Sequence, residues 1–137
     1  MNEYYPHFSQ AELESKDTRL NRVPGTGEHH MDPDFMLIIE LIREDYDKPM
    51  KVSSAYRTPD YNEKVSSTGL TGPHTTGQAI DIVVSGTDAL HLIHVALDSG
   101  IVGIGVSQKG PHGKRFIHLD NLPDAPGQPR PWLWSYS

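Results

Sequence analysis

The sequence predicts an α+β fold in which a small antiparallel sheet is flanked by two or three helices. The first observation is a capped run with an apolar stripe over residues 33–46, which indicates an amphipathic helix. The second is the β-branched run AIDIVV at 79–84, which is typical of a buried strand. The third is that two strand-like runs, 101–107 and 115–121, are joined by a connection short enough to favour an antiparallel hairpin.

The most regular helix pattern follows Asp32, an N-cap residue with a proline directly after it. This helix is expected to run from Pro33 to Tyr46. Several apolar residues share one of its faces and are expected to be buried. They are Phe35, Ile38, Ile39 and Ile42, with Met36, Leu37 and Leu41 widening the stripe.

Two shorter helices are predicted from their start signals. Ser9, with Glu12 three residues later, forms a capping-box pattern for a helix within 8–15. Thr58-Pro59 repeats the cap-then-proline signal and predicts a helix over 59–65.

The remaining elements complete one expected domain over residues 1–137. Residues 50–55 alternate enough to predict a strand. A last helix is expected from Gly86 to the C′ glycine Gly100. Its apolar stripe is expected at Leu90, Ile93 and Leu97. We find no internal repeat, linker or low-complexity tract, so one core is expected.

Composition narrows the function classes. The net charge is -6 and the pI is near 5.7, so general attraction to nucleic acid is not expected to supply binding energy. The chain has no cysteine, so any metal must be held by His, Asp or Glu. No window approaches the ~18 apolar residues of a membrane span, and no signal peptide is visible. We therefore expect a protein made in the cytoplasm without a membrane span.

Asp81 raises the question of how a carboxylate is tolerated in an apolar strand. Alternate residues of a strand share a face, so Asp81 lies with Ala79 and Val83, opposite the isoleucines of the run. A buried, unpaired carboxylate costs several kcal/mol. A divalent ion would satisfy it, and so would a salt bridge from an arginine such as Arg57.

Two histidines extend the metal hypothesis. His74 precedes the strand of Asp81, and His118 shares a face of the predicted strand 115–121 with Phe116 and Asp120. Two imidazoles, one carboxylate and an open position are what a catalytic zinc site requires. Five other histidines are expected to be exposed or packed rather than to bind metal, namely His7, His29, His30, His91 and His94.

Three motifs, taken in order, carry a resemblance to a known family. They are SSAYRTPDYN at 53–62, His-x-x-Gly-x-Ala-x-Asp at 74–81 and FIHLD at 116–120. Together they resemble the zinc D-alanyl-D-alanine carboxypeptidase family, which belongs to a wider group with lysostaphin-type endopeptidases and the hedgehog signalling domain. The similarity covers most of the chain and looks closest to short, single-domain phage and bacterial members.

The resemblance implies that His74, Asp81 and His118 hold one Zn²⁺ ion. It also implies that Arg57 faces the substrate carboxylate or carbonyl oxygen, a task that suits the planar, permanently charged guanidinium. The implied substrate is the stem peptide of peptidoglycan.

The chain departs from the family pattern at two positions. Gly72 stands where relatives usually have a serine, so a hydrogen bond there is missing or replaced. Arg115 stands where many relatives place the Glu or Asp that acts as general base. Asp120 and His112 are the alternative base candidates, and Asp120 is equally well interpreted as a partner that orients a ligand ring.

The resemblance therefore implies a zinc metallopeptidase that hydrolyses peptidoglycan peptides through a metal-activated water, as a D,D-carboxypeptidase or an endopeptidase, and we expect a monomer. Its place of action would be the cell wall, reached after phage lysis or by partner-assisted export. The alternative is a catalytically inactive, zinc-containing binding or structural module of the same fold.

In the tail, Trp132, Trp134 and Tyr136 alternate at strand period and are expected to pack in the core rather than to form a binding platform.

Overall fold

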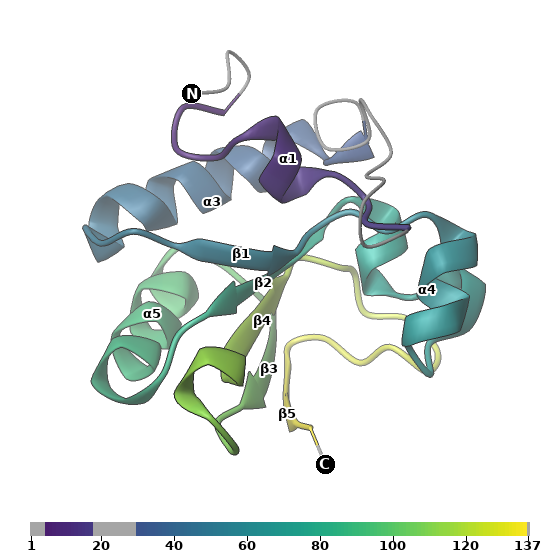
Figure 1. Cartoon of the computed structure of the whole chain (residues 1–137). Coiled ribbons are helices and arrows are strands. Elements are labelled where there is room, and N and C mark those ends of the chain that lie inside the picture. The colour runs from purple at the N-terminus through teal and green to yellow at the C-terminus, as the bar shows by residue number, and fades with distance from the viewer. Residues whose placement is uncertain (1–4, 18–29, 137) are drawn as a thin grey trace.

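A five-stranded sheet forms the centre of the molecule in the computed structural model, which describes residues 5–17 and 30–136 (Figure 1). The strand order is β1-β2-β4-β3-β5. The strands are β1 (Lys51–Ser54), β2 (Ala79–Val83), β3 (Gly103–Ser107), β4 (Phe116–Asp120) and β5 (Trp132–Ser135). The α-helices are α1 (Gln10–Leu13), α3 (Pro33–Tyr46), α4 (Pro59–Val65) and α5 (Gly86–Asp98). Short 3₁₀ turns are η1 (Gly69–Thr71), η2 (Pro73–Thr76) and η3 (His112–Lys114). The α+β prediction is confirmed.

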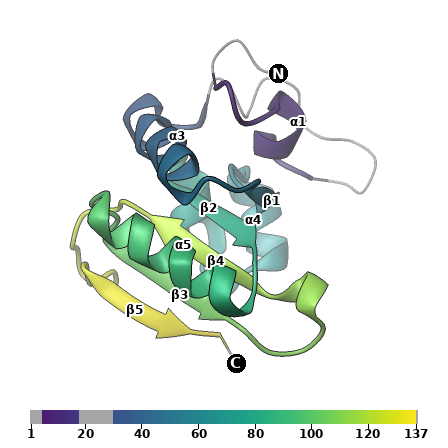
Figure 2. The same cartoon turned by 90° about the vertical axis from the view of Figure 1, so that its left-hand side faces the viewer.

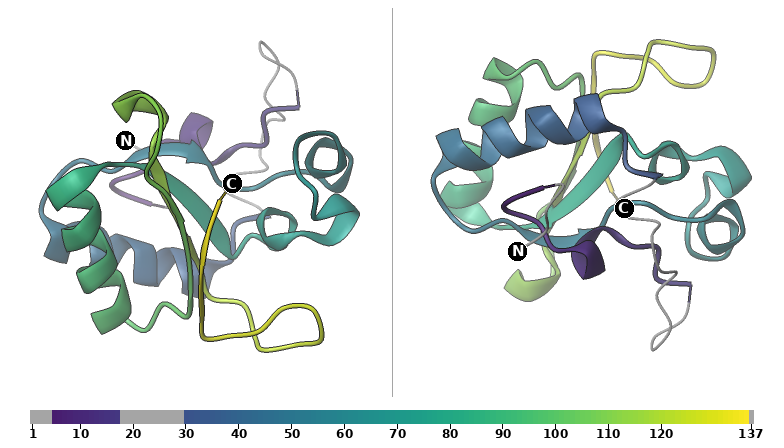
Figure 3. Two further views of the ribbon diagram at one scale, coloured as in Figure 1. Left: turned by 90° about the horizontal axis from the view of Figure 1, so that it is seen from below. Right: turned by 90° about the horizontal axis from the view of Figure 1, so that it is seen from above.

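The sheet is mixed rather than wholly antiparallel. The pairs β1·β2, β2·β4 and β3·β4 are antiparallel, and the predicted hairpin of β3 and β4 is confirmed. β5 pairs parallel to β3, beginning where Trp132 lies opposite Gly103. Asp120, the last residue of β4, also pairs with Gly103. The segment after β4 loops out and returns to that same end of the sheet, so β5 must run in the direction of β3 (Figure 3).

The core lies between the sheet and two helices. α3 and α5 cover one face, and α4 lies behind the other (Figure 2). Ile80 and Ile82 of β2 point into the core, as do Ile117 and Leu119 of β4. Burying each such side chain contributes about 1.5–3 kcal/mol. The intervening residues of both strands therefore face the opposite side of the sheet, where polar side chains can lie outside the hydrophobic core.

The helix ends follow the predicted signals closely. α3 spans Pro33–Tyr46, and the Asp32 carboxylate accepts a hydrogen bond from Phe35 N at 2.9 Å. The capping box of Ser9 and Glu12 forms at α1. Thr58 Oγ1 caps α4 by accepting from Tyr61 N.

The predicted apolar stripes are partly wrong. Leu37 and Leu41 of α3 are exposed, and so are Leu90 and Leu97 of α5. α5 instead buries Ala89, Leu92, Val95 and Ala96. The core therefore covers the side of α5 that carries these four residues, and Leu90 and Leu97 lie on its exposed side. Among the described helices, none is long and apolar enough to cross a membrane.

A glycine is required at 77, between η2 and β2, by its backbone conformation and by a close contact. Its φ is 77°, and a Cβ there would lie 1.9 Å from the carbonyl oxygen of His30. Its own carbonyl oxygen accepts from Asp32 N at 2.9 Å, which ties the start of α3 to the start of β2. Glycine supplies both the left-handed conformation and the close approach.

Gly77→Ala is expected to lower the free energy of unfolding by about 2–4 kcal/mol, because it adds backbone strain to a steric clash. Urea denaturation of the metal-free protein measures the loss. Gly113→Ala is the matched control, since a Cβ at Gly113 meets nothing within 4 Å, and it should change stability by less than about 0.5 kcal/mol. Equal stability of the two variants would contradict the structural requirement at Gly77.

Candidate metal centre and cleft

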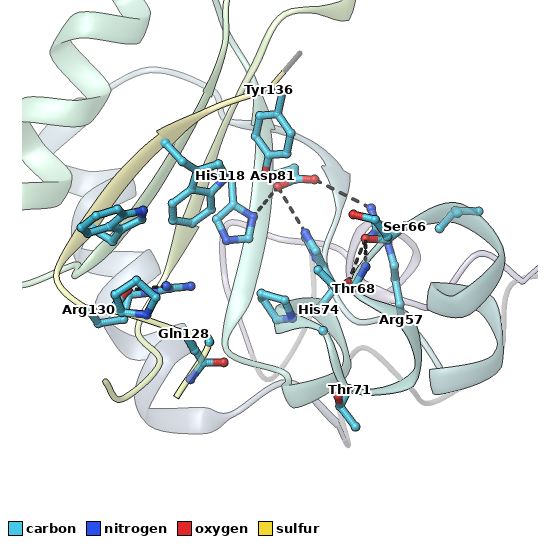
Figure 4. A pocket seen from close by; sticks show the side chains of 18 of the residues that line it. Arg57, Ser66, Thr68, Thr71, His74, Asp81, His118, Gln128, Arg130 and Tyr136 are labelled. Atoms are coloured by element: carbon cyan, nitrogen blue, oxygen red, sulfur yellow. Dashed lines mark hydrogen bonds and ion pairs between the residues drawn. The ribbon is translucent and has the colours of Figure 1, made fainter. Parts of the chain in front are cut away.

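His74, Asp81 and His118 meet on the face of the sheet opposite the core helices. Asp81 and His118 stand directly opposite each other in the β2·β4 pair, and η2 brings His74 beside them. The Asp81 Oδ1 atom lies 3.0 Å from His118 Nδ1 and 3.3 Å from His74 Nε2. One ligand atom from each residue lies within 4.8 Å of the others, and all three residues are buried. Figure 4 shows the three side chains pointing toward one another.

The outer nitrogen of each imidazole is held by an acceptor. His74 Nδ1 donates to the carbonyl oxygen of Ala55 at 2.7 Å. His118 Nε2 donates to Asp120 Oδ2 at 2.7 Å. Each ring therefore turns its other nitrogen toward Asp81, which is the arrangement found in metal-binding histidines. Two imidazole nitrogens and one carboxylate oxygen, facing a cleft, fit a zinc ion with an open position.

The electrostatics of the centre favour a cation. Burial alone would raise the pKa of Asp81, but the charge of His74 and hydrogen bonds from both imidazoles outweigh burial and lower it. Burial alone would lower the pKa of His118, but its bonds to Asp120 and Asp81 raise it. The buried carboxylate of Asp81 is therefore stabilised by positive charge beside it, which a divalent ion would supply.

Arg57 lines the same cleft and is held mainly by neutral partners. Its Nε donates to Ser54 Oγ and its Nη1 to Asn62 Oδ1, each at 3.0 Å. Its Nη2 lies 4.0 Å from Asp81 Oδ2, a loose ion pair. A salt bridge to Arg57 thus accounts for only one side of Asp81, because the other oxygen faces the two imidazoles. Apart from this 4.0 Å contact, no ion pair of Arg57 with a carboxylate is found among the described residues.

Asn62 and Thr68 also belong to the site, although no sequence pattern predicted a role for them. Asn62 is fully buried, and its Nδ2 donates to Thr68 Oγ1 at 2.9 Å while its Oδ1 holds Arg57. A Cβ at Gly72 would lie 1.9 Å from Thr68 Oγ1. The threonine hydroxyl therefore fills the space that a serine at 72 would occupy. The inclusion of Asn62 in the SSAYRTPDYN motif was the one signal available.

Asp120 has no free oxygen atom. Arg130 Nε donates to its Oδ1 and Arg130 Nη2 to its Oδ2, both at 2.8 Å, and His118 also donates to Oδ2. Burial opposes ionisation, but the hydrogen bonds from His118 and Arg130 dominate and lower the pKa of Asp120 to about 2. This geometry supports the interpretation of Asp120 as a partner that orients His118.

The other predicted base, His112, is not brought to the centre. It lies exposed on η3 and is not among the described residues that line the cleft. Arg115 directs its Nε to the carbonyl oxygen of Gly110, on the same loop. Of the described cleft-lining residues, Asp81 alone carries a carboxylate.

The remaining described histidines have other surroundings. His7 pairs with Glu40, His30 stacks on Tyr56, and His94 lies 3.5 Å from Asp98. His91 lies near Lys48. His29 falls outside the described residues.

The tail aromatics form a wall of the cleft, so the prediction that they pack in the core is wrong. The cleft has a volume of about 910 Å³, and Trp132, Trp134 and Tyr136 line it. Trp132 is 54% exposed, whereas the Trp134 ring lies 5.1 Å from the His118 ring. β5 lies at the edge of the sheet and is mostly exposed, and its alternate side chains line the cleft instead of the core. Burial, with the charge of Asp81, raises the pKa of Tyr136 to about 12, so its phenol stays protonated.

A family model described as Peptidase M15 matches residues 6–120. The match includes Arg57 and all three metal-facing residues, and it ends before Arg130 and β5. None of the curated proteins matches the chain.

Proposed function

As a member of the Peptidase M15 family this chain is a zinc metallopeptidase, and we propose that it hydrolyses peptidoglycan stem peptides as a D,D-carboxypeptidase or an endopeptidase. The observation that carries the proposal is the metal-facing triad at the base of an open cleft that also presents Arg57. We propose that the chain works as a monomer at the cell wall, which it reaches after phage lysis or by partner-assisted export.

A zinc ion held by His74, Asp81 and His118 would polarise the scissile carbonyl and bring the pKa of water to about 7. The residues of the chain position the peptide. Arg57 offers its guanidinium to the carboxylate that ends a stem peptide, since its present partners Ser54 and Asn62 are uncharged. Tyr136 lines the same cleft and its phenol stays protonated, so its hydroxyl is a candidate donor to an oxyanion that develops in the cleft.

Asp120→Asn tests whether Asp120 acts as support or as base. Because both its oxygens are engaged, we expect zinc affinity to fall by about 10–100-fold, with much of the turnover regained at saturating zinc. Loss of a general base would instead leave zinc affinity intact and lower kcat by about 10²–10⁴. Zinc titration and kcat at saturating zinc separate the two roles, and His112→Ala, assayed in parallel, tests the other base candidate.

One observation favours a second candidate, a zinc-containing binding or structural module without turnover. Among the cleft residues that the structure describes, no carboxylate other than Asp81 is present to accept a proton. In that case the cleft would hold a wall peptide and release it uncut.

Mass spectrometry of products from defined stem peptides, with zinc-loaded protein, tests the proposal. Release of a terminal D-amino acid identifies a carboxypeptidase, and cutting of a cross-linked dimer identifies an endopeptidase. Both activities should stop when a chelator is added. Stoichiometric zinc binding without cleavage of any stem peptide would establish the module.

A further inference from the structure

Arg130 forms an ion pair with Asp120, the residue that holds the outer nitrogen of His118. Its guanidinium meets Asp120 with two parallel hydrogen bonds of 2.8 Å, and both side chains are buried. Bidentate pairs of this kind fix the plane of a carboxylate as well as its charge. The same carboxylate accepts from His118 Nε2, so Arg130 is one residue removed from a metal-facing ring.

Arg130 is itself held on several sides. Its guanidinium carbon lies 5.0 Å from the ring of Trp134, and its Nη1 donates to the carbonyl oxygen of Pro129 at 2.7 Å. Its backbone N donates to Asp124 Oδ1 at 3.0 Å. The arginine therefore holds one orientation, because stacking and hydrogen bonds act on the same side chain.

β3 leaves a space that this pair fills. A Cβ at Gly103 would lie 2.1 Å from Asp120 Oδ1 and 2.7 Å from Arg130 Nε. Gly103 has an ordinary backbone conformation, since no positive φ is found there, so its small size serves the close approach. The absence of a side chain at 103 is an observation independent of the hydrogen bonds, and it points to the same contact.

We propose that Arg130 is a positioning residue of the zinc centre, which acts on His118 through Asp120. The guanidinium fork fixes the carboxylate so that Oδ2 receives the Nε2 proton of His118. The ring is thereby kept with Nδ1 directed at Asp81 and at the ion. The segment after β4 thus helps to orient a metal-binding residue in addition to lining the cleft, although it lies beyond the part of the chain that matches the family model.

The test is zinc affinity, measured by competition with a chelating dye. Arg130→Gln is expected to weaken zinc binding by about tenfold, and Arg130→Lys, which keeps the charge and loses the fork, by less. Arg43→Gln, an arginine on α3, is the matched control and should leave affinity unchanged. If Arg130→Gln does not fold by circular dichroism, the comparison of Arg130→Lys with the parent decides.

Two further readouts separate positioning from general destabilisation. If Arg130 acts through Asp120, the double variant Arg130→Gln, Asp120→Asn should bind zinc no more weakly than Asp120→Asn alone. In ¹⁵N spectra of the zinc-loaded parent, His118 should show a protonated Nε2 whose proton exchanges faster with solvent in Arg130→Gln. Additive losses, or unchanged affinity and exchange in Arg130→Gln, would overturn the proposal. Because no peptide is used, failure to cleave stem peptides does not affect this result.

Discussion

Asp81→Asn is expected to abolish tight zinc binding and, with it, hydrolysis. Oδ1 of Asp81 is the atom on which both imidazoles converge, at 3.0 and 3.3 Å. Asparagine keeps the volume but removes the negative charge that offsets a divalent ion in a buried site. We expect zinc affinity to fall by more than about 100-fold, a larger loss than substitution of an outer partner causes.

Thermal denaturation with and without zinc provides the measurement for Asp81. A ligand present at 100 times its Kd stabilises the folded state by about 2.7 kcal/mol, so zinc should raise the Tm of the parent and leave that of the variant unchanged. Asp98→Asn, at an exposed carboxylate on α5, is the control and should keep the full zinc response. A zinc-dependent rise in Tm of equal size in Asp81→Asn would remove Asp81 from the ligand set.

Arg57→Gln is expected to lower kcat/KM by about 100-fold on a stem peptide that ends in a free carboxylate. The hydrogen bonds of the guanidinium go to uncharged partners, and its ion pair with Asp81 is loose. Loss of a charge-assisted, bidentate contact at a desolvated site costs about 2–5 kcal/mol. The kcat/KM of Arg57→Lys should lie between those of the parent and Arg57→Gln, because lysine keeps the charge but loses the planar, bidentate geometry of the guanidinium.

The same peptide with an amidated terminus gives the internal control for Arg57. If Arg57 binds the terminal carboxylate, parent and variant should cleave the amidated peptide at similar, low rates. If Arg57→Gln lowers kcat/KM by the same factor on both peptides, Arg57 instead stabilises charge on the reacting carbonyl. The comparison therefore also tests for a carboxypeptidase preference.

The helix ends were predictable because their chemistry is local. Asp32-Pro33 and Thr58-Pro59 carry a cap and a fixed φ within two residues, and both helices begin where these signals place them. By contrast, the burial predicted for Leu90 and Leu97 of α5 was wrong, because burial depends on packing between distant parts of the chain. The sequence shows which residues are apolar, but it does not show which side of the helix the folded core covers. The core covers the side that carries Ala89, Leu92, Val95 and Ala96.

The metal-facing residues were also predictable, since strand alternation places Asp81 and His118 away from the core. The orientation of the rings was not, because it depends on acceptors that are distant in the chain, such as Ala55 for His74. The same holds for Thr68, which replaces the side chain missing at Gly72, and for the buried Arg130. Each of these contacts exists only once the chain has folded.

The cross-strand register of Asp81 and His118 has a consequence for how the protein handles its ion. Backbone ladders on both sides of β4 hold these two residues face to face, and the hydrophobic layer beneath them is complete without any metal. In small zinc modules, metal binding supplies most of the folding free energy, and removal of the ion unfolds the chain. Here the sheet holds two of the three metal-binding residues in place by its own backbone pairing, so we expect the metal-free protein to stay folded and zinc to be removed and restored without a refolding step.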